Sequence, residues 1–137
     1  MPYVFDTNAL SVAMRKHRLA RHPLFAEWLR TLPRSDQYTC ATVVGELRFG
    51  ARKSTQHTQL LLHRIDEVIS HLTVLDYDLL AADRYSIIRA DLFTRGLVID
   101  EADMQIAACA LQHNCAVVTA NVKHFACVAG LQVHAVS

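Results

Sequence analysis

Apolar residues along this chain occur in two alternating patterns, short continuous runs and longer segments with helical spacing. Short apolar runs bounded by polar residues predict buried strands, whereas apolar residues at i, i+3, i+4 and i+7 predict helices. Strands are expected in the run that ends at Asp6 and at residues 38–41, 73–75, 116–119 and 131–133. Helices are expected at residues 8–16, 23–32, 42–53, 57–71, 79–96 and 100–113, and residues 120–125 are expected to form a loop and turn.

This alternation of strands and helices predicts the fold class. Consecutive strands that are separated by helices pair in parallel, and the helices cover both faces of the resulting sheet. Thr42 and Asp78 are expected to cap the helices that follow them. No repeat, low-complexity tract or Gly/Ser linker divides the chain, so residues 1–137 are predicted to form a single α/β domain.

Composition narrows the class of protein. With 52% hydrophobic and 20% charged residues, the chain has the profile of a compact globular protein. It contains no apolar run of the roughly 18 residues that a membrane span requires and shows no secretory signal, so a cytoplasmic location is expected. The net charge of +1 means that any binding of nucleic acid must depend on local basic clusters.

Common cofactor and metal motifs do not occur. The four cysteines contain no C-x-x-C pair, which favours reduced thiols over a disulfide framework or a zinc site. Neither G-x-G-x-x-G nor a P-loop is present, which disfavours dinucleotide and P-loop nucleotide binding.

Polar side chains follow two of the predicted strands. Asp6 comes directly after the first strand, and Asn121 lies just beyond the strand at residues 116–119. In open α/β sheets, ligands bind at the carboxyl ends of the strands, which makes both residues candidates for a site. The structural alternatives are that Asp6 is an N-cap and Asn121 a turn residue.

Two acids lie on helix faces that are otherwise apolar. Glu46 falls within the apolar arc of its helix, between Phe49 and Gly50 on the helical wheel, and Asp103 precedes Ile106 and Ala107 on the face expected to pack on the sheet. A buried ion pair would explain Glu46, and compensation of the helix dipole would explain an acid in a first turn.

Geometry links these acids. All are expected at one edge of a parallel sheet, where carboxylates repel one another unless a cation neutralises them. Hard divalent cations with oxygen ligands suit such a set, so a Mg²⁺ site is predicted, with Mn²⁺ as a possible substitute.

The motifs also resemble those of the PIN-domain ribonucleases, and within them the VapC-like toxins of type II toxin–antitoxin pairs. The similar segments are residues 5–8, 44–51, 88–92 with Gly96, 103–108 and 118–125, which occur in the family's order. The resemblance implies a three-layer α/β/α sandwich and a Mg²⁺-dependent endoribonuclease site. Asp6, Glu46 and Asp103 match the family's recurrent acids, and Asn121 matches a polar position after the fourth strand. Related toxins often carry an acid where this chain has His124, and Asp100 and Asn121 are both candidates to take over part of its role.

The resemblance further implies an RNA substrate such as tRNA, a homodimer, and a cognate antitoxin that inserts a helix or tail near the acids. In the expected mechanism, Asp6, Glu46 and Asp103 bind the metal, which activates a water for attack on a phosphodiester. Basic residues at 15, 16, 18, 21, 48, 52 and 123 are candidates for steering RNA. The alternatives are a PIN-like module that binds RNA or protein without cutting, which the substitution at His124 favours, and a receiver-type signalling domain, which the lack of a second acid beside Asp6 disfavours.

Overall fold

A five-stranded sheet lies at the centre of the molecule, in a computed structural model that describes residues 1–137. The strand order is β3-β2-β1-β4-β5, and all four strand pairings are parallel. The strands are β1 (Tyr3–Phe5), β2 (Gln37–Cys40), β3 (Thr73–Leu75), β4 (Ala116–Thr119) and β5 (Val133–Ala135). The predicted α/β class with a parallel sheet is therefore confirmed.

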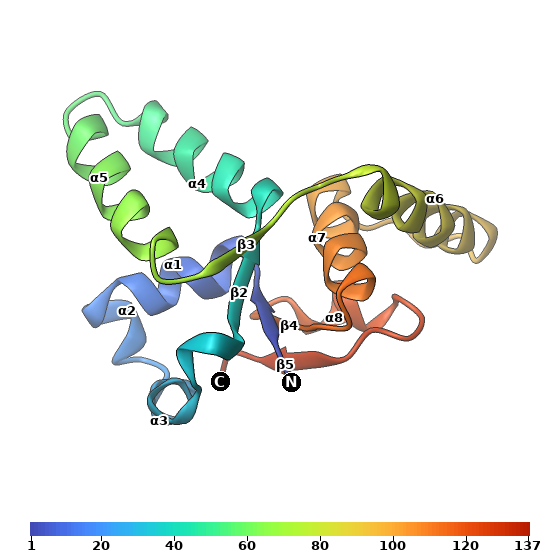
Figure 1. Cartoon of the computed structure of the whole chain (residues 1–137), viewed down its shortest axis with the longest axis horizontal. Coiled ribbons are helices and arrows are strands. Elements are labelled where there is room, and N and C mark those ends of the chain that lie inside the picture. The colour runs from blue at the N-terminus through green and yellow to red at the C-terminus, as the bar shows by residue number, and fades with distance from the viewer.

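Helices cover both sides of the central strands, as Figure 1 shows. The first group, on the left in that view, is α1 (Thr7–Met14), α2 (Lys16–Leu19), α3 (Pro23–Thr31), α4 (Ala41–Lys53) and α5 (Thr58–Ile69). The second group, on the right, is α6 (Leu79–Thr94), α7 (Glu101–Gln112) and α8 (Val122–Ala126). A short 3-10 turn, η1 (Arg34–Asp36), leads into β2.

The core forms around β1, the middle strand, and its neighbour β4. Val4, Phe5, Val117 and Val118 are buried, as expected for strands that helices cover on both faces. The buried hydroxyl of Thr39 donates to the Phe5 carbonyl at 2.9 Å, which fixes the end of β1 against β2. None of the helices combines the length and the apolar character that crossing a bilayer requires.

The structure corrects the prediction after β4. Residues 120–125 were expected to form a loop and turn, but α8 begins at Val122 and its Phe125 is fully buried. Burial of this ring stabilises a short helix for which the local sequence gives little signal. The last strand is also displaced, from the expected 131–133 to Val133–Ala135, because β5 pairs with β4 through Val117↔Val133 and Thr119↔Ala135.

Helix starts were partly wrong as well. The helix expected at 8–16 divides into α1 and the short α2, with extended Arg15 between them. Thr42 does not cap α4, since the helix already begins at Ala41 and the Thr42 hydroxyl donates to Gln105 on α7 at 3.1 Å. Asp78 caps α6 as predicted, because its carboxylate accepts the Ala81 amide at 2.9 Å.

Candidate active site

Asp6 lies at the carboxyl end of β1 and is only 4% exposed. Its own amide donates to the Val118 carbonyl at 3.0 Å, which holds the residue beside the end of β4. Its carboxylate accepts the Ala9 amide at 2.8 Å and so caps α1. Asp6 is therefore both the N-cap of α1 and a candidate site residue at the end of β1. The side chain of Thr7, the next residue, does not cap the helix and donates to Glu46 instead.

The environment of Asp6 opposes its ionisation. Burial, reinforced by the negative charges of Asp103 and Glu46, raises its pKa to about 6, against the hydrogen bonds that it accepts from Thr119 and Ala9. A carboxyl with this pKa exchanges its proton near neutral pH. The repulsion also shows that the three acids, from three different elements, share one neighbourhood.

Glu46 is held on α4 by a contact with the first helix. The Thr7 hydroxyl donates to its carboxylate, which connects residues 39 positions apart. Its predicted place within a buried apolar arc is wrong, because the neighbouring Phe49 is exposed and Glu46 itself is half-buried. Glu46 thus needs no buried ion pair, and Thr7 and solvent together satisfy its charge.

Asp103 sits in the first turn of α7, and its side chain is 17% exposed. Burial raises its pKa, and Asp100 adds to this effect, while the hydrogen bond to His124 acts against it. Nδ1 of His124 lies 3.1 Å from an Asp103 oxygen and 2.7 Å from Nδ2 of Asn121. The position where related toxins often carry an acid is therefore occupied by a side chain that touches a candidate ligand.

These residues line one hollow at the carboxyl edge of the sheet, as the strand-end rule predicts. The hollow has a volume of about 440 Å³ and is lined by Asp6, Thr7, Asn8, Glu46, Asp100, Asp103, Ala120 and Asn121. All four predicted site residues are thus brought together. Asp100, one of the two residues considered as a replacement for the missing fourth acid, also lines the hollow, just before α7.

The donor set suits a hard divalent cation, since several carboxylates face one polar hollow and depress one another's ionisation. However, no three acidic, histidine or cysteine side chains converge closely enough to hold an ion directly. Glu46 accepts a hydrogen bond from Thr7, and Asp103 contacts His124. Mg²⁺ usually keeps several waters and requires only one or two carboxylates, so the set fits such an ion with water completing its shell.

Known proteins are similar to this chain over most of its length. Ribonuclease VapC2 of Haemophilus influenzae is 31% identical over 134 residues, covering 96% of each chain. The tRNA(fMet)-specific endonuclease VapC of Shigella flexneri is 38% identical over 87 residues, or 64% of this chain and 65% of that protein. Among solved structures, VapBC-1 from nontypeable Haemophilus influenzae superposes with a TM-score of 0.85 at 27% identity, covering 98% of each chain.

The family model for the PIN domain matches residues 3–131. This range includes strands β1 to β4 and every residue that lines the acidic hollow. This match, the acids at the carboxyl edge of a parallel sheet and the curated VapC ribonucleases agree with one another. The chain therefore belongs to the PIN-domain family, and its relatives within that family are VapC ribonucleases.

Proposed function

We propose that this protein is a metal-dependent endoribonuclease and the toxin of a toxin–antitoxin pair. The observation that carries the proposal is the hollow in which Asp103 and Glu46 help to raise the pKa of buried Asp6 to about 6. A structural role does not require mutually repelling carboxylates at a ligand-binding edge, whereas a cation-binding role does. Relatives with ribonuclease activity supply the reaction class.

Asp6, Glu46 and Asp103 are the residues that would hold Mg²⁺, directly or through water. When bound, such an ion lowers the pKa of a bound water and stabilises the charge that develops on a phosphodiester. The protein's own groups supply orientation, because the Ala9 amide fixes Asp6 and the Thr7 hydroxyl fixes Glu46. Asn121, exposed on the rim, offers an amide that can bind a phosphate oxygen.

Structured RNA such as tRNA is the proposed substrate class, since one relative is a tRNA(fMet)-specific endonuclease. The direct test incubates purified protein with total tRNA in Mg²⁺, in Mn²⁺ and in excess chelator, and maps the RNA ends by sequencing. Cleavage at discrete positions is expected with either ion and none with chelator. Cleavage that persists in chelator would contradict the metal-dependent assignment.

The second candidate, a PIN-like module that binds without cutting, is favoured by His124 at a position that is often acidic. It predicts retention of tRNA on the protein in Mg²⁺ with no new RNA ends. The salt dependence of tRNA binding tests whether basic side chains contact the phosphates. If they do, the affinity for tRNA should fall steeply as the salt concentration rises.

An antitoxin partner is proposed for the groove beside the acids. This groove, of about 910 Å³, is lined by residues of α1, α2, α4 and α5 and shares Thr7, Asn8 and Glu46 with the acidic hollow. Leu47, Leu61, Ile65 and Val68 give it apolar lining, while Arg15, Lys16 and Arg64 add positive charge. An amphipathic segment with acidic flanks would match this surface and reach the acids.

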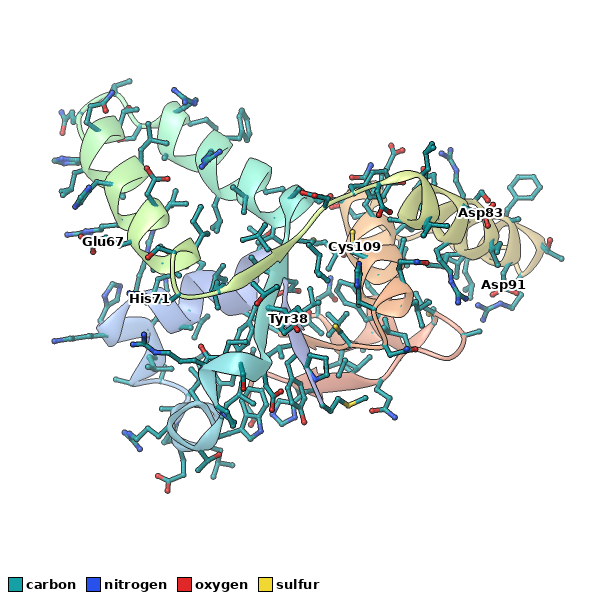
Figure 2. All side chains as sticks on the ribbon, viewed as in Figure 1. Tyr38, Glu67, His71, Asp83, Asp91 and Cys109 are labelled. Atoms are coloured by element: carbon teal, nitrogen blue, oxygen red, sulfur yellow. The ribbon has the colours of Figure 1, made fainter.

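A homodimer is proposed through α6. Its residues Ala81, Ile88 and Leu92 are buried inside the monomer, yet Leu80 and Ile87, which lie off that buried face, are 61% and 56% exposed. Leu79, Phe93 and Val98 add further exposed apolar surface along α6 and the turn that follows it. A helix that is apolar on both faces is typical of one buried on both, and this one projects from the molecule (Figures 1 and 2).

We therefore expect Phe93→Glu to shift the purified protein from dimer to monomer, because a charge would have to be desolvated at the interface. Light scattering coupled to gel filtration measures this change in mass. Leu24→Glu is a matched control, since Leu24 on α3 is 72% exposed and far from α6 in the chain. A wild-type protein that elutes as a monomer, or a Phe93→Glu variant that remains dimeric, would contradict the α6 interface.

A further inference from the structure

His124 contacts two residues of the candidate site at once. It stands in the short helix α8, and its side chain is 41% exposed. Its Nδ1 lies 3.1 Å from Oδ2 of Asp103 and 2.7 Å from the Asn121 amide. One ring nitrogen therefore sits between a candidate metal ligand on α7 and a polar residue after β4.

Hydrogen-bond chemistry fixes the roles of the three groups. An ionised carboxylate only accepts hydrogen bonds, so a favourable contact with Asp103 requires the proton on Nδ1 of His124. With the proton there, Nδ1 cannot accept from the Asn121 amino group, so we read the Asn121 atom at 2.7 Å as the carbonyl oxygen, which shares the single Nδ1–H with Asp103. The orientation of an amide is an assignment made from the surrounding network, and this network favours the flipped form.

This arrangement has two consequences for the site. The Nδ1–H holds one oxygen of Asp103, which leaves the other oxygen free for an ion. The Asn121 carbonyl faces His124, so its amino group is directed away from the ring as a hydrogen-bond donor. The amide of Asn121 is also fixed at its backbone, because its N–H donates to the Thr119 hydroxyl at 2.8 Å.

We propose that His124 is a positioning residue, whose Nδ1–H orients the Asp103 carboxylate for the metal and directs the Asn121 amino group toward the phosphate of the substrate. Ligating carboxylates in metal sites are typically held by such outer hydrogen bonds, and their loss costs about 10- to 100-fold in affinity or activity. The inference rests on the proposed function, since it takes Asp103 to be a metal ligand. It gives the histidine a role that a fourth acid at this position would not have.

The test compares His124→Ala with His124→Asn, because an asparagine amide can place a donor close to the position of Nδ1. Mn²⁺ affinity is measured by calorimetry on the RNA-free protein, and kcat and KM are measured separately with RNA. We expect His124→Ala to bind Mn²⁺ about tenfold more weakly and to lose about tenfold in kcat with KM nearly unchanged. His124→Asn should recover most of both losses.

Val122→Ala is the matched control, since Val122 lies on the same short helix, is 38% exposed and is not among the residues that line the acidic hollow. Unchanged Mn²⁺ affinity in His124→Ala would overturn the inference alone. Equally weak binding in His124→Asn and His124→Ala would also overturn it, because the ring itself would then be required, as for a direct ligand. A wild-type protein that binds no Mn²⁺ would overturn both the inference and the proposed function.

Discussion

Replacing Asp103 with asparagine is expected to lower the rate of RNA cleavage about 1000-fold, because losing a metal ligand removes several kcal/mol of transition-state stabilisation. The substitution conserves shape, and the new amide oxygen can still accept the hydrogen bond from His124, so the fold should persist. Initial rates on a labelled tRNA at saturating Mg²⁺ measure the effect. The midpoint of thermal unfolding checks the fold.

Asp83→Asn provides the control for this prediction. Asp83 is exposed on α6, the helix that projects from the molecule in Figure 2, and it is not among the residues that line the acidic hollow. The same chemical change there should leave the cleavage rate within about twofold, as for most surface substitutions. If the Asp103→Asn variant cleaved tRNA at the wild-type rate, Asp103 would have no role in the reaction.

The second large effect concerns stability. The metal-free protein is expected to lose about 3 kcal/mol of unfolding free energy through Asp6 as pH rises from about 4 to about 6.5. The folded-state pKa of Asp6 is raised from 3.8 to about 6, so between these values the folded chain holds a proton that the unfolded chain has released. Stability from this group is therefore complete below the lower pKa and is lost as pH rises through the higher one.

Asp103 adds to this trend, since burial also raises its pKa. Urea unfolding in excess chelator at several pH values measures the slope. Asp6→Asn should flatten the profile and raise stability at pH 7, because the amide keeps an oxygen for the Ala9 N–H but carries no charge. Asp83→Asn should keep the wild-type slope, and parallel profiles for Asp6→Asn and wild type would contradict the prediction.

Together the two effects describe a site that destabilises its own fold. The acids to which the proposed function assigns the reaction repel one another in the absence of a cation, and removing one is expected to lower activity while raising stability. Such a trade-off is common where function requires an unfavourable arrangement of charge. The same repulsion means that a bound cation, or a cationic group from a partner, should stabilise the folded protein when it occupies the hollow.

Much of the fold follows from local sequence. Strands β1 and β4 are predicted because their apolar runs are short and bounded by polar residues, and Asp78 is predicted as a cap because capping depends on only three following residues. Local pattern fails at α8, since five residues cannot form a stable helix until Phe125 finds its place in the core. It also fails at Glu46, because the helical wheel does not show that Phe49 is left exposed.

The sequence by itself determined which residues can form the site, since an acid or amide at a strand end or in a first helical turn is a property of neighbouring residues. The tertiary structure decided what those residues touch. Thr7 holds Glu46 across 39 residues and His124 holds Asp103 across 21, and no local rule links such positions. These pairs exist because parallel strands bring distant segments to one edge, where packing and hydrogen-bond chemistry select each partner.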